Sequence, residues 1–406
     1  MLQALCDSGT TSRPELIRLT GLSRATVSVL VADLIAAGLV QEDNGPAGQE
    51  SRPMGRPAQL LSLNRSAAYA IGADIGHAHV RVALCDLGGE PVWDQVEAKE
   101  VDRAPHETLD LAADLIHRAI RDCGVPRERV LGLGAGIACP VDGQGALGAE
   151  GIMPGWIGIR PGAELERRTG LTTHLINDAN AGALAEHLYG AGRNTDDLVY
   201  VRLSAGIGAG IVVAGRLVLG IGGQAGEIGH LPAVQGGLVC RCGNRGCLET
   251  VASPVALARL LRESWDEPVA PRDLPRLLAE NRTGAGRVID DAGEAVGRAL
   301  AGLVTLLNPR LIIIGGDLAV FGERLFGPIG RGIARQALPS AVTQVAVVAG
   351  ELGSCAEVRG AAGLVLARAP RSLAVIGGAD YGSSADDARP PGLCSAPRAS
   401  RPALAD

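Results

Sequence analysis

The sequence predicts a mixed α/β protein in which a small helical module precedes a larger, two-lobed α/β domain. Residues 1–65 carry closely spaced helical signals, whereas residues 66–369 alternate β-rich and helical segments with glycine at the turns. A β-hairpin with a glycine turn occurs twice in the larger part, which indicates a duplicated fold with a cleft between two lobes. Residues 370–406 are rich in Ala, Pro, Ser and Arg without apolar periodicity, so we expect a disordered tail there.

Composition limits the classes of function. The chain of 406 residues is 47% hydrophobic but only 2% aromatic, so its cores must be built from Ala, Val, Leu and Ile. A net charge of −6 argues against a polycation that coats nucleic acid. The chain does not open with a basic start and an apolar run, and its uncharged stretches are shorter than the roughly 18 residues of a membrane helix. We therefore expect a cytoplasmic protein without a membrane partner.

Residues 1–65 carry the pattern of a winged helix-turn-helix. Ser12 predicts the start of a helix over residues 14–19, with a capping box completed by the glutamate three residues later. Ser23 predicts the start of a longer helix over residues 24–37. A glycine-containing turn separates the two helices, and a polar loop and a strand follow the second. In a winged helix-turn-helix the second helix enters the major groove of DNA.

Small or polar side chains early on the second helix are the candidate DNA contacts. They face away from its apolar stripe and suit phosphates and base edges: Ser23, Arg24, Thr26 and Ser28. Charge leaves the question open, because residues 1–65 contain six arginines and six acidic residues, whereas a DNA-binding domain is usually more basic. A small helical module that binds another protein is the alternative.

The two hairpins of the larger domain span residues 70–86 and 198–213. Glycine turns bring backbone N–H groups together, and such groups suit phosphate oxygens, so a matched pair indicates an ancestral nucleotide cleft. Tight hairpins also need glycine for their own geometry, which is the alternative. An apolar strand over residues 311–314 ends in a glycine pair. That strand suits contact with a ribose or adenine, and equally suits a plain buried strand.

A polar run at residues 177–180 follows an apolar strand and precedes a helix over residues 181–188. Side chains at the carboxyl end of such a strand point into the cleft of an open α/β sheet. Asp178 could therefore take a proton from a substrate hydroxyl. The alternative is that Asp178 or Asn180 caps the following helix.

Three cysteines and one histidine form the most specific motif. Cys240, Cys242 and Cys247 lie close together in the sequence, and His230 precedes them. Three thiolates and one imidazole make a tetrahedral zinc set, and in a cytosolic chain such a cluster indicates metal binding before a disulfide. A structural zinc has all four positions filled by protein, so we expect a structural and not a catalytic ion. The alternative is a chance cluster of reduced cysteines.

These motifs together resemble the ROK family, named for repressors, open reading frames and kinases. The resemblance covers residues 10–369 and rests on the cysteine signature, on Gly226-Glu227-x-Gly-His230, on Asn177-Asp178-Ala-Asn and on the winged-helix runs Thr20–Ser28 and Gly55-Arg56-Pro57. It implies a winged helix-turn-helix over residues 1–65 and an actin-like, hexokinase-type (ribonuclease H-like) domain of two lobes over residues 66–369. In that likeness Arg56 lies at the wing, within reach of a minor groove.

The resemblance also assigns a sugar site. Its residues are Asn177, Asp178, Glu227, His230 and Glu249. Carboxylates, an amide and an imidazole supply the acceptors and donors that sugar hydroxyls need. We expect His230 to give one ring nitrogen to zinc and to present the other to the sugar. Asp178 matches the catalytic base of the family's kinases.

Departures from the kinase pattern favour a sensor over an enzyme. The first hairpin reads Asp74-Ile-Gly-His-Ala-His where the family's kinases carry Asp-x-Gly-Gly-Thr-Lys, and the second hairpin lacks the kinase threonine. Phosphoryl transfer depends on positioning and charge, so the loss makes ATP a doubtful cofactor. The residues of this degraded nucleotide site are Asp74, Gly76, Gly206, Gly208, Gly210, Gly315 and Gly316.

The sequence therefore predicts a sugar-responsive transcriptional regulator, a repressor, with operator DNA and a monosaccharide or sugar derivative as its partners. Two half-sites on DNA call for two copies of the winged helix, so we expect a homodimer or a higher homo-oligomer. The alternative is an ATP-dependent, glucokinase-like sugar kinase fused to a DNA-binding domain, with Asp178 as its catalytic residue.

Overall fold

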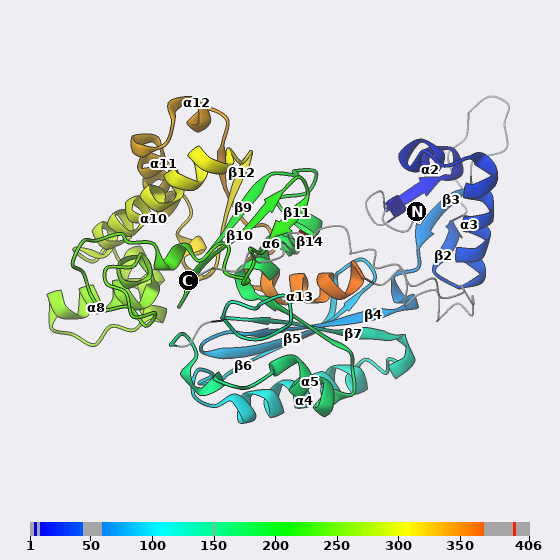
Figure 1. The fold of residues 1–406 in the computed structure, drawn as a ribbon, viewed down its shortest axis with the longest axis horizontal. Helices are drawn as coiled ribbons and strands as arrows, with labels where there is room; N and C mark the ends of the chain where they lie inside the picture. Colours follow the sequence, from blue (N-terminus) through cyan, green and yellow to red (C-terminus); the bar gives the residue numbers. More distant parts are fainter. Residues whose placement is uncertain (1–3, 6–8, 44–58, 149–150, 369–392, 395–406) are drawn as a thin grey trace, which may run out of the picture.

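The computed structural model describes residues 4–5, 9–43, 59–148, 151–368 and 393–394, and all statements below refer to these residues. Three β-sheets organise the chain: one in a small N-terminal module and one in each of two larger lobes (Figure 1). Among the described residues, no single helix is long and apolar enough to cross a membrane. Only α2 and α3 taken together, bent by 114°, reach that length and composition.

The N-terminal module is a winged helix-turn-helix, as the sequence predicts. Its sheet is antiparallel, with the strand order β1-β3-β2. Leu16, Val27, Val31 and Leu61 are buried in its core. The elements are β1 (Thr10–Ser12), α2 (Arg13–Thr20), α3 (Arg24–Ala36), β2 (Val40–Asp43) and β3 (Leu60–Leu63).

Both predicted helix caps of this module are confirmed. The Ser12 hydroxyl accepts the Glu15 N–H, and the Ser23 hydroxyl accepts the Thr26 N–H. The second half of the expected capping box does not form, because the Glu15 carboxylate accepts hydrogen bonds from Arg18 instead. The sequence also gave no sign of β1, which pairs with β3 and closes the small sheet.

The two lobes repeat one topology, which confirms the predicted duplication. In each lobe three antiparallel strands form a meander, and two further strands join in parallel on the side of the first strand. Lobe 1 contains β4 (Tyr69–Ile75), β5 (His79–Asp86), β6 (Pro91–Ala98), β7 (Val130–Ile137) and β8 (Thr173–Asn177), in the order β6-β5-β4-β7-β8. Lobe 2 contains β9 (Leu198–Leu203), β10 (Ile207–Val213), β11 (Arg216–Val218), β12 (Leu311–Gly315) and β13 (Ala346–Ala349), in the order β13-β12-β9-β10-β11.

The expected C-terminal tail, residues 370–406, lies outside the described residues except at one point. The backbone of β14 (Leu393–Cys394) pairs in parallel with β11 and extends the sheet of lobe 2.

Helices cover the outer faces of both sheets (Figure 1). In lobe 1 these are α4 (Pro105–Asp122) and α5 (Pro161–Thr169), which pack on each other. In lobe 2 they are α7 (Glu249–Ala252), α8 (Pro254–Trp265), α9 (Leu274–Ala279), α10 (Ala285–Leu307), α11 (Glu323–Gln336) and α12 (Pro339–Val342). Short 3-10 turns connect elements: η1 (Arg65–Ala67), η2 (Arg127–Arg129), η3 (Pro154–Trp156), η4 (Ile228–His230), η5 (Pro271–Asp273), η6 (Asp317–Phe321) and η7 (Gly353–Cys355).

Two helices lie between the sheets and join the lobes (Figure 1). α6 (Asp178–Tyr189) packs on β9 and β10 of lobe 2, and α13 (Ala356–Leu366) packs on β4 and β7 of lobe 1. The helices also pack on each other at Gly360, where an added Cβ would lie 1.8 Å from the carbonyl oxygen of Ala181. At Gly134 of β7 an added Cβ would lie 1.8 Å from the carbonyl oxygen of Ala361. α13 is therefore held backbone to backbone on both sides.

Gly360→Ala is expected to destabilise the two-lobed domain strongly. The new methyl group would meet backbone atoms of α6, which cannot rotate away, so we expect a loss of about 3 kcal/mol of unfolding free energy. Gly302→Ala in α10 is the matched control, because nothing lies within 4 Å of an added Cβ there. Alanine should be neutral at that position or stabilise the helix by up to about 1 kcal/mol. Thermal melts followed by circular dichroism make the comparison, and equal melting temperatures for the two variants would contradict this packing.

Candidate functional site

A pocket lies between the two lobes and brings together all five residues that the resemblance assigns to a sugar. Lobe 2 and the start of α6 supply most of its wall, and His77, Pro140 and Ile152 of lobe 1 close it. The five predicted residues that line it are Asn177, Asp178, Glu227, His230 and Glu249. The pocket is narrow, with a volume of about 30 Å³. A larger ligand therefore requires side chains or lobes to move apart.

Asn177 and Asp178 occupy the junction between β8 and α6. The Asn177 side chain caps α6 by accepting the Asn180 N–H at 3.1 Å, and it donates to Asp178 Oδ1 at 3.0 Å. Asp178 Oδ1 also accepts the Ala179 N–H. The sequence offered Asp178 or Asn180 as the N-cap of this helix, but the residue that caps it is Asn177. The Asp178 carboxylate is buried and lines the pocket.

Glu227, His230 and Glu249 form the opposite, acidic wall. Glu227 Oε2 lies 3.7 Å from His230 Nε2, and Glu249 Oε2 accepts the Ile207 N–H of the second hairpin. Burial, together with the nearby Asp178 and Glu249 carboxylates, raises the pKa of Glu227 to about 7. Burial lowers the pKa of His230, which favours the neutral imidazole that a metal ligand requires. This wall offers several oxygen acceptors to hydroxyl donors.

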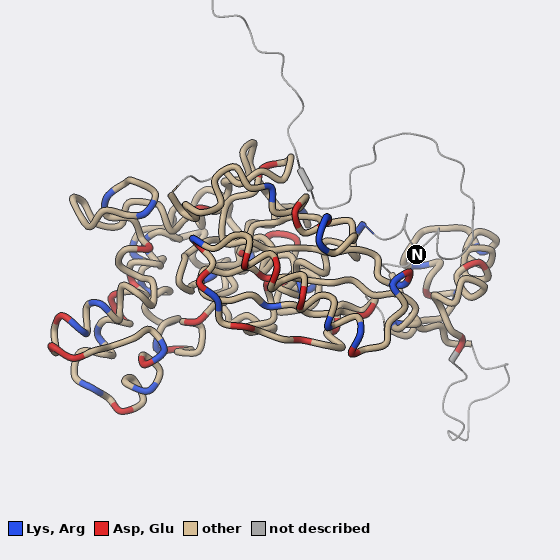
Figure 2. The backbone as a smooth tube through the Cα atoms, turned by 90° about the horizontal axis from the view of Figure 1, so that it is seen from below, with Lys and Arg blue, Asp and Glu red and all other residues tan. Residues whose placement is uncertain are grey.

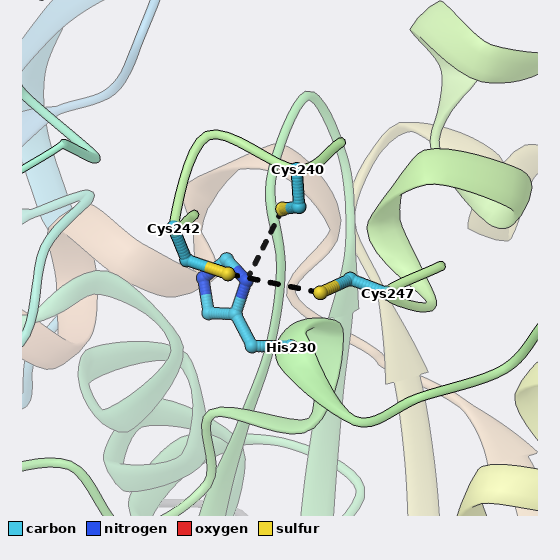
Figure 3. Close-up of side chains that lie close together, drawn as sticks. All are labelled: His230, Cys240, Cys242 and Cys247. Atoms are coloured by element: carbon cyan, nitrogen blue, oxygen red, sulfur yellow. Dashed lines mark hydrogen bonds between the residues drawn. The ribbon is translucent and has the colours of Figure 1, made fainter. Parts of the chain in front are cut away.

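His230, Cys240, Cys242 and Cys247 converge on one point (Figure 3). Their ligand atoms all lie within 4.8 Å of one another. Cys242 Sγ is 3.7 Å from Cys247 Sγ, and Cys240 Sγ is 3.6 Å from His230 Nδ1. Tetrahedral Zn²⁺ with Zn–S bonds of about 2.3 Å and Zn–N bonds of about 2.0 Å places such ligand pairs roughly 3.5–3.8 Å apart. The four side chains therefore fit a zinc ion.

The histidine connects this cluster to the pocket. His230 Nδ1 faces the Cys240 sulfur, while Nε2 faces Glu227 in the pocket. The chain reaches Glu249, at the start of α7, soon after Cys247. One loop therefore carries both the candidate metal ligands and two pocket residues, and the two ring nitrogens of His230 face different groups.

The first glycine hairpin is filled by two imidazoles. His79 Nε2 lies 2.8 Å from Asp74 Oδ2, and His77 Nδ1 lies 2.6 Å from Asp102 Oδ1. Burial opposes the charged form, but the hydrogen bond to Asp74 raises the pKa of His79 above its ordinary value. An added Cβ at Gly76 would lie 2.4 Å from the His79 ring. The turn that would face a phosphate in a nucleotide site is thus occupied by side chains.

Most of the other glycines of the degraded nucleotide site serve packing. An added Cβ at Gly210 would lie 2.3 Å from Ala183 of α6, and one at Gly315 would lie 2.2 Å from the Tyr200 hydroxyl. Gly316 has a positive φ of 82° and lies against the backbone of Leu203. Of the seven residues in that set, Gly206 and Gly208 line the pocket between the lobes.

Two arginines that were not predicted from the sequence form ion pairs with carboxylates of the site. Arg202, on β9, is buried and places Nη1 3.1 Å from Asp178 Oδ2. Arg241 lies between two cysteines of the cluster, with Nε 3.3 Å from Glu249 Oε1 and Nη1 3.4 Å from Asp102 Oδ2 in lobe 1. Arg202 could have been found from the sequence, because it is the one charged residue in the otherwise apolar run of β9. No comparable signal marked Arg241, because its partners are distant in sequence.

The candidate DNA contacts are all exposed at the start of α3. Ser23, Arg24, Thr26 and Ser28 are all exposed, although the Ser23 and Thr26 hydroxyls lie 2.9 Å apart within the helix cap. Arg56 lies outside the described residues. Figure 2 shows basic and acidic residues intermixed along the described chain, without a block of one sign on the module. Any affinity for DNA must therefore depend on a few specific side-chain contacts and not on a basic surface.

The sequence of residues 70–368 matches the ROK family over about three quarters of the chain. The chain belongs to the ROK family. Residues 1–49 match the MarR family, in the part that folds as the winged helix-turn-helix. A ROK domain behind a DNA-binding module is the makeup of a ROK transcriptional regulator.

Relatives of this ROK protein include both regulators and kinases. The xylose repressor of Bacillus subtilis (strain 168) is 30% identical over 314 residues, which cover 77% of this chain and 80% of the repressor. The glucokinase of Thermotoga maritima is 36% identical over 324 residues, which cover 73% of this chain and 97% of the kinase. The crystal structure of a ROK family transcriptional regulator, a homolog of the Escherichia coli MLC protein, matches with a TM-score of 0.73 and 28% identity over 91% of this chain and 93% of that one.

Proposed function

We propose that this ROK regulator represses transcription by binding operator DNA through α3 and the wing, and that a monosaccharide or close derivative in the pocket between the lobes releases it. One observation carries the proposal: the five polar side chains of the pocket converge while the adjoining nucleotide hairpin is filled by His77 and His79. A pocket with an intact acceptor set and a blocked phosphate side suits binding without phosphoryl transfer.

The narrowness of the pocket supports a release mechanism. Arg241 reaches from the cysteine loop of lobe 2 to Asp102 and to the Ile152 carbonyl oxygen of lobe 1. A sugar ring needs more space than the about 30 Å³ present, so its binding favours a different arrangement of the lobes. A ligand shifts such an equilibrium by its difference in affinity for the two arrangements. Both the sugar and the operator would then act on one conformational equilibrium.

We infer that zinc is the ion of the His230 and cysteine cluster. Held by His230, Cys240, Cys242 and Cys247, it would fix the loop that carries His230 and Glu249 and would supply no catalytic step, because protein fills all four positions. The ion's role is thus to hold pocket residues in place.

The alternative function is an ATP-dependent sugar kinase, favoured by the 36% identity to a glucokinase and by Asp178 in the pocket. The first hairpin argues against it, because His77 and His79 occupy the turn that would face a phosphate of ATP. Sugar phosphate formed from ATP by the wild-type chain, and lost in Asp178→Ala, would establish the kinase.

Assembly and location follow from the proposed role. A regulator that reads two half-sites needs two winged helices, so we infer a homodimer or higher homo-oligomer. Its place is the cytoplasm, where the operator lies. We assign DNA binding to residues 1–65 and sugar sensing to residues 66–369, and no function to residues 370–406.

Operator binding is expected to be tight, steeply salt-dependent and sensitive to Arg24→Ala. Fluorescence anisotropy on a duplex selected from a random pool by the zinc-loaded protein measures it, with and without D-xylose, D-glucose and sugar phosphates. Each lost phosphate contact should reduce the salt slope by about one. Arg272→Ala is the control, since Arg272 is an exposed arginine at η5 in lobe 2. Absence of specific binding at every salt concentration would contradict the regulator.

A further inference from the structure

A buried charge network joins the pocket to α13. The Arg202 guanidinium lies between two carboxylates, with Nη1 3.1 Å from Asp178 Oδ2 and Nε 3.1 Å from Glu357 Oε1. The Tyr200 hydroxyl donates to the same Glu357 oxygen at 2.9 Å. Arg202 is 7% exposed and Glu357 4% exposed, so water screens these charges little. Asp178 lines the pocket, whereas Glu357 does not.

The far end of α13 packs against an apolar cluster that the DNA-binding module shares with lobe 1. Glu357 lies in the first turn of the helix, and Leu366 ends it, about 14 Å further along at 1.5 Å per residue. Leu366 packs into an apolar cluster with Leu39 and Leu63 of the winged helix-turn-helix. The same cluster includes Leu34 and Ala37 at the end of α3. One helix therefore joins the charge network at its start and, at its end, an apolar cluster that also includes the base of the recognition helix.

α13 is unable to bend or slide locally along this path. An added Cβ at Gly72 would lie 2.0 Å from the Val358 carbonyl oxygen, and the contacts at Gly134 and Gly360 are equally close. Backbone surfaces packed without intervening side chains leave no space for small adjustments, so such elements move as rigid pieces. A force on Glu357 is thus transmitted to Leu366.

We propose that Arg202 and Glu357 are positioning residues that couple occupancy of the pocket to the DNA-binding module through α13. This inference rests on the proposed function. A sugar hydroxyl that donates to Asp178 competes with Arg202 for the same carboxylate. The guanidinium then interacts more strongly with Glu357, and α13 moves as one rigid piece with the elements packed on it and carries the base of α3 with it.

Glu357→Gln in the full-length, zinc-loaded chain tests the proposal. The amide keeps the shape and the Tyr200 hydrogen bond but removes the charge that Arg202 would follow. The readout is the coupling factor: the ratio of operator Kd with saturating D-xylose or D-glucose, whichever binds the wild type, to operator Kd without sugar. We expect a factor of ten or more in the wild type and less than three in the variant, with sugar Kd and sugar-free operator Kd each changed less than threefold.

Glu90→Gln is the matched control. Glu90 is exposed, and its Oε1 lies 2.7 Å from Nη2 of Arg359 on α13. It does not line the pocket. Its loss should leave the coupling factor within twofold of the wild type. If Glu357→Gln does not fold, Tyr200→Phe replaces it, because this change removes only the hydroxyl that orients Glu357; its coupling factor should fall two- to threefold.

Three results would overturn the proposal. A coupling factor in Glu357→Gln equal to the wild type's would show that α13 is not the path. An equal loss in Glu90→Gln would show that any ion pair on α13 matters. A wild type that binds sugar and operator without coupling would remove the relay but keep both binding sites, whereas a wild type that binds neither would reject the proposed function itself.

Discussion

Removal of the metal from the His230 and cysteine centre is expected to abolish the sugar response before it unfolds the chain. The loop between His230 and Glu249 contains no helix or strand beyond isolated bridges, so the four ligand bonds of the ion would add to the few backbone hydrogen bonds that hold both residues at the pocket. The winged helix-turn-helix has its own core, which contains no residue of this loop. We expect sugar affinity to fall at least 100-fold, which is about 2.7 kcal/mol, while sugar-free operator binding persists.

Cys242→Ser and a chelator together test this expectation. Atomic absorption should find one zinc per chain in the wild type and none in the variant, and calorimetry should find no sugar binding to the variant. Cys123→Ser is the control, because Cys123 lies at the end of α4, away from the cluster. A zinc-free protein that still releases operator on addition of sugar would show that the ion does not support the pocket.

Asp178→Asn is expected to produce a regulator that no longer responds to sugar. The substitution removes the charge that would accept a sugar hydroxyl and leaves Arg202 paired with Glu357 alone. A hydrogen bond to a charged group contributes about 1.5–3 kcal/mol, so sugar affinity should fall by roughly 10- to 100-fold. Operator affinity without sugar should fall toward the sugar-bound value of the wild type, because an Arg202 that is released from Asp178 is the state that the proposed relay assigns to the occupied pocket.

Calorimetry and anisotropy on the same preparations measure both affinities. Asp110→Asn is a suitable control, since Asp110 is an exposed carboxylate of α4 that pairs with Arg168. Unchanged sugar affinity in Asp178→Asn would move the sugar site away from this pocket. The same pair of proteins, assayed with ATP, separates the sensor from the kinase.

The sequence by itself determined those features of the fold that depend only on residues close together in the chain. Ser12 and Ser23 predicted the starts of two helices, because an N-cap side chain bonds only to the N–H groups two or three residues ahead. The two glycine-containing hairpins predicted the duplicated sheets, since the geometry of a tight turn depends on the residues within it. The spacing of the three cysteines predicted the candidate metal centre, since these ligands are also close together in the sequence. Resemblance to the ROK family added Glu227 and Glu249, whose roles no local pattern indicates.

Tertiary structure alone decided which charges meet. Arg202 and Glu357 are 155 positions apart, and Arg241 and Asp102 are 139 apart, so neither pair has a local signature. The polar run at residues 177–180 predicts a helix only from residue 181, whereas α6 begins at Asp178. Only the packing at Gly360 and Gly134 shows that α13 is held between the lobes, and only the apolar cluster at its end links it to the DNA-binding module. Turns, caps and ligand spacing are short-range properties of the chain, whereas a buried ion pair exists only where the fold brings its two halves together and excludes water.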